Sequence, residues 1–186
     1  MARPRRIDRA AVLRESLALA DEAGIEAITM QAVADRLGVT PMALYRHVAN
    51  KADLLDGVVE SLLDEVPDPA VDQPWADQLT AMAGALRATA RRHPSVFPLL
   101  LQRPATTPAA RRARDRVCAA LRDAGVDPRQ IPRVERIVST MVLGFAASEA
   151  GGRFRAHSRR VLDADFEALL DVIRVGLIAP LDPADP

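Results

Sequence analysis

The chain has 186 residues, of which 49% are hydrophobic and 27% charged, and its 25 basic side chains balance its 25 acidic ones. This composition suits a folded protein with a sizeable core and excludes a uniformly charged disordered chain, because such a chain repels itself. The single cysteine, Cys118, excludes an internal disulfide and a cysteine-built metal site. No apolar run is long enough for a signal peptide or a membrane span, so we expect a soluble cytoplasmic protein. No cofactor and no metal ligands are predicted, and the sequence leaves open whether a metal takes part.

The first 66 residues contain the start signals of four helices. Apolar residues recur at helical spacing and no alternating run predicts a strand, so the fold is expected to be all-α. The predicted starts are residues whose side chains can accept a hydrogen bond from a first-turn N–H, namely Asp8, Thr29, Thr40 and Asn50. Gly24 and Gly38 mark the ends of the first two helices, and Pro41 suits a first helical position.

The prolines of VPDPAVDQP, residues 66–74, forbid a continuous helix, and we place a domain boundary between residues 66 and 67. The second domain, residues 67–186, is predicted to contain five more helices. They span residues 75–92, 96–101, 107–125, 127–151 and 163–178. His93 precedes a proline at a predicted helix end, and we interpret it as a cap on the last carbonyls of that helix.

Charge is segregated between these parts of the chain. Residues 52–86 contain eight acidic and no basic side chains, whereas residues 87–160 contain sixteen basic and five acidic ones. The arginines at 111, 112, 114 and 116 are interpreted as a solvated helix face. The most basic segment, residues 87–160, therefore lies in the second predicted domain.

One motif covers residues 29–47, which have the spacing of two short helices joined by a turn. Ala34 is small at a point where two helices must approach, and Gly38, four residues later, suits a left-handed backbone in the turn. In a helix-turn-helix, the second of these helices enters the major groove of DNA. Similar spacing also occurs in helical hairpins that do not bind DNA.

The surrounding residues carry a more specific resemblance. The stretch GIEAITMQAVADRLGVTPMALYRHVANKADLLD, residues 24–56, resembles the tetracycline-repressor (TetR) family of bacterial transcription regulators. The matching features are LGV at 37–39, LYxHV at 44–48 and NKxxLL at 50–55, although most members have Phe in place of Val48. The second half resembles the family's ligand and dimer domain in topology. The resemblance implies a homodimeric repressor of a two-fold symmetric operator on double-stranded DNA.

Ten residues are candidates for DNA contact. Helix-start N–H groups at Thr29 and Thr40 and the hydroxyl of Tyr45 suit phosphate oxygens. Lys51 is a cation at a helix start, where it opposes the helix dipole, which indicates an anionic partner. Gln31 can pair with adenine through two hydrogen bonds. The other candidate base contacts are Pro41, Met42, Ala43, Arg46 and His47. Arg3, Arg5 and Arg6 form either a basic arm on the DNA or a solvated tail.

The second domain is expected to form a dimer and a pocket. Apolar stripes on the last two helices predict a four-helix interface through Val134, Val138, Val142, Phe166, Leu169, Ile173 and Leu177. The alternative is that these stripes only close the core of one subunit. A small, largely apolar effector is expected to contact Met82, Leu86, Phe97, Leu100, Leu101, Met141 and Phe145. A filled core would contain the same residues.

No catalytic site is predicted. The three histidines, His47, His93 and His157, have no HExxH spacing and no cysteine partner nearby. The sequence therefore predicts a DNA-binding regulator and not an enzyme. Two alternatives remain at this point: a DNA-binding regulator without a small-molecule effector, and an unrelated helical protein that binds a partner.

Overall fold

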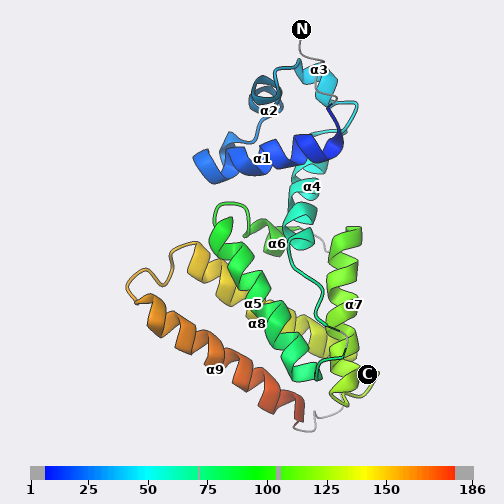
Figure 1. Ribbon diagram of the computed structural model, residues 1–186, viewed down its shortest axis with the longest axis vertical. Coiled ribbons are helices and arrows are strands. Elements are labelled where there is room, and N and C mark those ends of the chain that lie inside the picture. The colour runs from blue at the N-terminus through cyan, green and yellow to red at the C-terminus, as the bar shows by residue number, and fades with distance from the viewer. Residues whose placement is uncertain (1–6, 71, 104–105, 179–186) are drawn as a thin grey trace.

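The computed structural model describes residues 7–70, 72–103 and 106–178, and over these ranges it is all-helical, as predicted (Figure 1). The helices are α1 (Arg9–Ala23), α2 (Met30–Leu37), α3 (Pro41–Leu44), α4 (Lys51–Asp64), α5 (Trp75–Arg92), α6 (Leu99–Gln102), α7 (Pro108–Asp123), α8 (Ile131–Ala150) and α9 (Arg159–Ile178), with a short 3-10 turn at Ile25–Ala27. None of the helices in these ranges is long and apolar enough to cross a membrane.

Local capping explains where the helices of the first unit begin. The side chains of Asp8, Thr29 and Asn50 accept hydrogen bonds from first-turn N–H groups of α1, α2 and α4, at 2.7, 3.0 and 3.0 Å. These caps confirm three of the four predicted starts. Thr40 begins α3 as expected, but its hydroxyl makes no capping bond within the described chain, and α3 is only four residues long.

The turn between α2 and α3 depends on Gly38, whose φ of 69° lies in the left-handed region. The N–H of Val39 then reaches back to the carbonyl of Ala34 at 2.9 Å. Ala34 and Leu44 are fully buried beside this turn. Gly57 of α4 allows α1 to pack closely, because an added Cβ would lie 2.5 Å from a methyl group of Leu13.

Three helix boundaries in the second unit differ from the prediction. α6 begins at Leu99 instead of residue 96, because Val96 and Phe97 belong to a turn whose N–H groups bind the carbonyl of His93. α8 begins at Ile131, after a turn over residues 127–130. α9 begins at Arg159, four residues before the predicted start, because the carbonyl of Ser158 already accepts the N–H of Leu162 at 3.1 Å.

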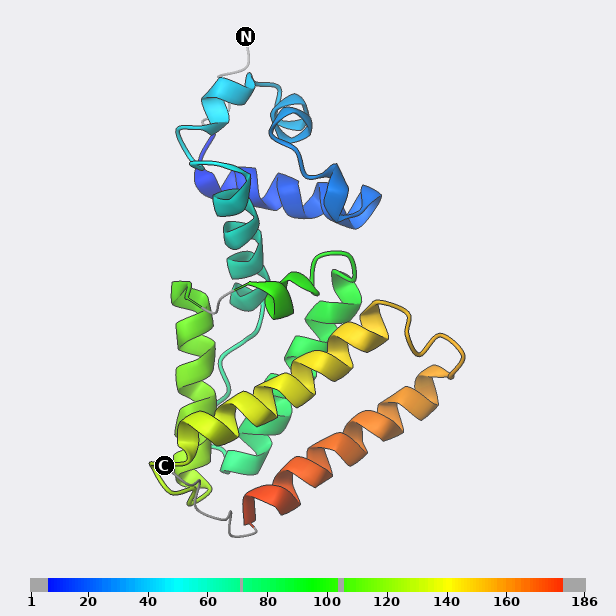
Figure 2. The ribbon, with the colours of Figure 1, turned by 180° about the vertical axis from the view of Figure 1, so that it is seen from behind.

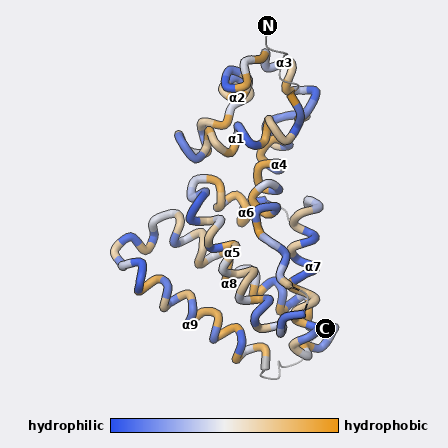
Figure 3. The backbone as a smooth tube through the Cα atoms, in the orientation of Figure 1, coloured by the Kyte–Doolittle hydropathy of each residue, from blue (hydrophilic) through white to orange (hydrophobic). Residues whose placement is uncertain are grey.

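The helices enclose two main cores. One lies among α1–α4 and also contains Val96, so the segment after α5 completes the core of the first unit. The other lies among α5, α7, α8 and α9. α8 and α9 run antiparallel, with α9 at the outer edge of the second unit (Figure 2). Hydrophobic and hydrophilic residues alternate along α9 (Figure 3). Its buried residues, at helical spacing on one face, are Leu162, Phe166, Leu170 and Ile173.

Ion pairs across the junction of the two units account for the segregated charge. The pairs that join α4 and the residues after it to the second unit are Glu65–Arg92 at 2.8 Å, Asp64–Arg112 at 2.6 Å, Asp56–Arg103 and Asp68–Arg116. Arg112 lies on an exposed helix face, as predicted, but it and the half-buried Arg116 also form ion pairs with acidic residues at and after the end of α4. The ring of His93 does not cap carbonyls: it lies 2.8 Å from Asp21 and 3.2 Å from Glu65.

Candidate DNA-binding surface and charged pocket

Nine of the ten candidate DNA-binding residues lie on α2, α3 and the adjoining loops, at one end of the molecule, and Lys51 is the first residue of α4 (Figure 1). All ten are exposed or partly exposed. Met42 is 73% exposed, and Tyr45 is also exposed although it is aromatic. Large apolar side chains exposed together are typical of a surface that contacts a partner. Arg3, Arg5 and Arg6 lie outside the described residues.

The loop between α3 and α4 is held by two residues of other elements. Arg9 of α1 donates to the backbone carbonyl of His47 at 2.8 Å and pairs with Asp53 of α4 at 2.7 Å. Asp53 also accepts the N–H of Ala49 at 2.7 Å. The bond from Arg9, assisted by the N–H of Ala49, holds the pKa of Asp53 below its ordinary value. These contacts fix the loop that carries His47 and leads to Lys51, and no motif in the sequence indicates this role of Arg9.

Gln31 is already engaged within its own helix. Its amide nitrogen donates to a carboxylate oxygen of Asp35, one turn later in α2, at 2.7 Å. The side chain must leave Asp35 before it can pair with an adenine. The competition was not anticipated from the sequence, although i, i+4 spacing of Gln and Asp is the signal that would have predicted it.

The structure places most predicted dimer residues inside one subunit. Val134, Val138, Val142, Phe166 and Ile173 are buried in the core of the second unit, and Leu169 and Leu177 pack partly buried against it. These side chains contribute to the core of a single chain. The large apolar side chains left exposed on α8 and α9 are Ile137, Val161, Val172 and Val175.

The seven predicted effector contacts do not line one cavity. Phe97 is fully buried in a small cluster with Ala90 and Ala146, whereas Leu101 of α6 is exposed. Leu100 packs against both that cluster and the core of the first unit. Met82 and Leu86 line an apolar cavity of about 40 Å³, which is too small for an effector. Met141 and Phe145 pack against the core nearby.

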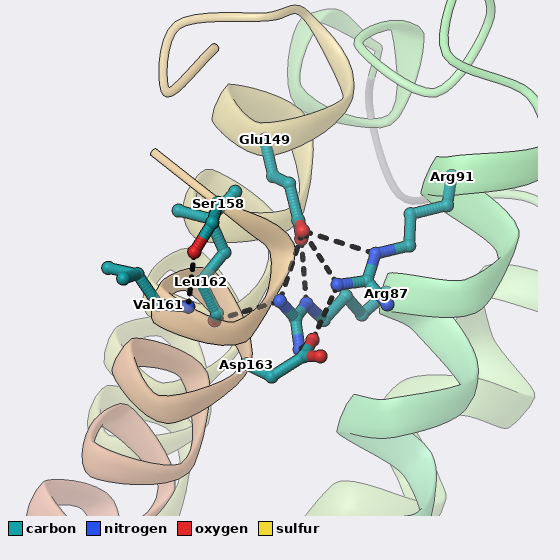
Figure 4. Close-up of polar contacts among 7 residues, drawn as sticks. All are labelled: Arg87, Arg91, Glu149, Ser158, Val161, Leu162 and Asp163. Carbon is teal, nitrogen blue, oxygen red and sulfur yellow. Dashed lines mark hydrogen bonds and ion pairs between the residues drawn. The ribbon is translucent and has the colours of Figure 1, made fainter. Parts of the chain in front are cut away.

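A much larger pocket, of about 780 Å³, opens between α5, α8 and α9, and its walls are charged. Arg87 of α5 donates to Glu149 of α8 at 2.6 and 3.0 Å, and both side chains are only 8% exposed (Figure 4). Arg87 also donates to the backbone carbonyl of Leu162 at 2.8 Å. Its guanidinium carbon lies 4.5 Å from the ring centre of Phe166 and 5.5 Å from that of Phe145, at cation–π distance.

A second arginine completes this network. Arg91, one turn after Arg87, donates to Glu149 and to Asp163 of α9, each at 2.7 Å (Figure 4). Burial opposes the ionisation of Glu149, but the hydrogen bonds from Arg87 and Arg91 outweigh it and hold the pKa of Glu149 below its ordinary value. The carboxylate is therefore charged at neutral pH. This site was not predicted from the sequence.

Comparison with known proteins agrees with the resemblance in both units. Residues 12–58 match the family model described as bacterial regulatory proteins, tetR family, and residues 79–173 match that of the tetracyclin repressor-like C-terminal domain. An HTH-type transcriptional regulator of Saccharopolyspora erythraea is 30% identical over 168 residues, which cover 85% of this chain and 71% of that protein. The HTH-type transcriptional repressor DrrR1 of Streptomyces coeruleorubidus is 29% identical over 157 residues, and this chain spans 58% of its length.

Solved structures share the fold. BioQ of Mycobacterium smegmatis is 27% identical, with a TM-score of 0.81 over 92% of this chain and 98% of BioQ. A structure of BioQ with its natural double-stranded DNA operator is 29% identical, with a TM-score of 0.79 over 94% of this chain and 100% of that one. The helix-turn-helix and the helical domain behind it define a DNA-binding transcription regulator. The chain belongs to the TetR family.

Proposed function

We propose that this protein is an effector-responsive transcriptional repressor that acts in the cytoplasm and binds a two-fold symmetric operator as a homodimer. The observation that carries the proposal is the geometry of α2 and α3, which pack through buried Ala34 and Leu44 and leave Met42, Tyr45 and Arg46 exposed at the end of the molecule. The operator complex of BioQ supports it. Residues 1–66 serve as the DNA-binding unit and residues 67–186 as the effector and dimer unit.

In this proposal α3 enters the major groove and the flanking groups hold the phosphates. Tyr45 and Lys51 are exposed on either side of the loop that Arg9 and Asp53 fix, so both reach outward from a rigid support. Phosphate contacts set the position of the helix on the duplex, and base contacts set its specificity. Met42 has no polar side-chain group, so its contribution to specificity is through thymine methyl groups or through shape.

We place the dimer interface on the outer faces of α8 and α9, instead of on the buried residues that the sequence predicted. The apolar residues exposed along one stripe of α9 follow helical spacing: Val161, Ala164, Ala168, Val172 and Val175. Val172 and Val175 are 61% and 68% exposed in the single chain. Because α8 and α9 are antiparallel, two copies can pair them as a four-helix bundle. A dimer also places two copies of α3 on one duplex.

We propose no catalytic role, because the relatives are transcriptional regulators. The test of the function is to select binding sites from a random duplex library at about 150 mM salt, because affinity for DNA depends steeply on salt. The expected result is a two-fold symmetric site whose half-sites are one helical turn apart, about 10 base pairs. Recovery of an asymmetric site would contradict the dimer, and recovery of no site by the folded protein would contradict the DNA-binding function.

A further inference from the structure

We propose that the pocket between α5, α8 and α9 binds a small organic anion, a carboxylate on an apolar body, and that Arg91 and Arg92 recognise its acid group. This inference rests on the proposed function, because it names the effector class of an effector-responsive regulator. It departs from the largely apolar effector that the sequence predicted. The pocket volume of about 780 Å³ lies within the range of small-molecule sites, about 300–1,000 Å³.

Arginine is the main charged residue type that lines the pocket. Arg87, Arg91, Arg92 and Arg159 lie there with Glu149 and Glu167. Asp163 and Glu65 also pair with three of these arginines, so an anion binds by exchange with a carboxylate. Arg87 and Arg91 lie one turn apart on the same face of α5, and Arg92, the next residue, lines the pocket from the neighbouring face. Arginine is well suited to a carboxylate, because its planar fork can donate two parallel hydrogen bonds.

Arg87 and Glu149 form the fixed floor of the pocket and keep their mutual pair, although Arg87 also pairs with Asp163 at 3.0 Å. Both side chains are buried, and Arg87 already donates to Glu149 and to the carbonyl of Leu162 while its face lies on Phe166. Removing a partner from such a buried pair leaves an uncompensated charge, which is strongly unfavourable. A ligand therefore meets this pair as a rigid surface.

Asp163 is the carboxylate that a ligand can replace. Its side chain is 51% exposed, against 8% for Glu149, and it accepts a hydrogen bond at 2.7 Å from Arg91, which lines the pocket, and pairs with Arg87 at 3.0 Å. An ion pair in contact with water contributes little to stability, so exchange of this carboxylate for a ligand carboxylate requires little free energy. Arg91 keeps its bond to Glu149 throughout and so remains oriented.

The rest of the wall suits an apolar body. Phe166, Leu162 and Ala88 line the pocket beside the arginines. Gly84 lies on the same face of α5, one turn before Ala88, and an added Cβ there would meet nothing within 4 Å. The space over Gly84 is open, so a side chain introduced at this position would occupy volume that we assign to the ligand.

The pocket also reaches the DNA-binding unit through Arg92. This residue lines the pocket and pairs with Glu65, next to the last turn of α4, at 2.8 Å. A ligand carboxylate on Arg92 competes with Glu65 for the same guanidinium group. Occupancy of the pocket therefore weakens one of the contacts that hold α4. If the ligand binds the protein more tightly when the Arg92–Glu65 pair is broken than when the protein is bound to its operator, the affinity for the operator falls by the ratio of those two ligand affinities.

The first experiment measures the melting temperature of the purified full-length protein with benzoate, 2-naphthoate and biphenyl-4-carboxylate, each against its neutral amide. Inorganic phosphate serves as the bare anion. At tenfold excess over Kd, a bound carboxylate raises Tm by about 3–6 °C for a chain of this size. We expect this rise for at least one carboxylate and not for its amide or for phosphate. An equal effect of the amide, an equal effect of phosphate, or no effect of any carboxylate at about 10 mM would overturn the proposal.

Two variants locate the site. Gly84→Leu fills the open space over α5, and we expect it to fold with a Tm at least as high as that of the wild type and to lose the response to carboxylates. Arg91→Gln should weaken carboxylate binding at least tenfold, as titration calorimetry measures it. The matched control is Arg111→Gln, which removes the same charge from the exposed face of α7 and should bind as the wild type does. Retention of full binding by Gly84→Leu contradicts the site.

The final measurement separates this inference from the function on which it rests. Operator binding is measured without ligand and then with the carboxylate that raised Tm, and we expect the operator Kd to rise at least threefold. If the protein binds a carboxylate but no operator, the result would support the proposed anion site and refute the proposed function. Operator binding that a saturating carboxylate leaves unchanged would refute the competition for Arg92.

Discussion

Replacing Glu149 with glutamine keeps the shape of the side chain but removes the charge that neutralises two arginines. The perturbation is severe because both Glu149 and Arg87 are only 8% exposed. Breaking a buried ion pair from one side costs about 3–5 kcal/mol of folding stability. Arg87 keeps its pairing with Asp163 at 3.0 Å, the carbonyl of Leu162 and the face of Phe166, so the loss lies near the lower limit, at about 3 kcal/mol.

Calorimetry of Glu149→Gln at pH 7 measures this loss. At about 2–4 °C per kcal/mol for a chain of this length, Tm should fall by about 6–12 °C. The control is Glu167→Gln, which removes an exposed carboxylate from the edge of the same pocket and should leave Tm nearly unchanged. A second variant, Arg87→Met with Glu149→Leu, replaces the pair with apolar side chains and should recover most of the loss. A loss below about 1 kcal/mol for Glu149→Gln would refute the assignment of Arg87 and Glu149 as a buried structural pair.

The same pair predicts a pH dependence. The folded-state pKa of Glu149 lies below its ordinary value, so the carboxylate stabilises the fold fully above the unfolded pKa of about 4.3, and the stabilisation is lost as the pH falls through the lower folded value. The difference in unfolding free energy between wild type and Glu149→Gln should therefore be constant between pH 6 and 7 and shrink below about pH 4. A difference that stays constant down to pH 3 would contradict the charged state assigned to Glu149.

Three further variants test the proposed function and the fold. Lys51→Ala should weaken binding to every DNA sequence and lower the salt slope of log K by about one, whereas Arg111→Ala, far from α3, should change neither. Gly38→Ala places a Cβ at a φ of 69° and should cost about 1 kcal/mol, measured by urea unfolding, while an unchanged midpoint would argue against the strained turn. Val172→Asp should convert a dimer of about twice 20.1 kDa into a monomer in sedimentation, and a dimer that persists would exclude the outer face of α9 as the interface.

The parts of the fold that could be predicted are those determined by neighbouring residues. Asp8, Thr29 and Asn50 cap helices whose N–H groups lie three residues away, and Gly38 adopts the one backbone conformation that its position in the turn requires. These signals are contained in short stretches of sequence. For the same reason the positions of the helix-turn-helix and of its exposed residues follow from the amino-acid sequence alone.

The residues of the proposed dimer interface and of the proposed effector pocket could not be predicted, because they depend on which face of a helix turns inward. Val138 of α8 and Val172 of α9 are the same residue type in two amphipathic helices, but the first is buried in its own subunit and the second is exposed. Helical spacing identifies an apolar stripe on a helix, but it does not show whether the same chain or a second subunit covers that stripe. Arg87 and Glu149 are 62 residues apart, and among so many arginines nothing in the sequence distinguished the one that is buried.

The position of α4, which connects the two units, explains the uneven distribution of charge along the sequence. This single helix of 14 residues carries Lys51 at its first turn and is followed directly by Glu65. The acidic residues along it and just after it pair with arginines from α5, α7 and the end of α6, and His93 lies between Asp21 and Glu65. Individually such exposed pairs contribute little, but together they fix the direction in which α4 leaves the second unit. Because a helix is stiff over this length, that direction also fixes where α3 lies. The acidic segment and the basic segment therefore position the DNA-binding unit, although neither one contacts DNA in the function proposed.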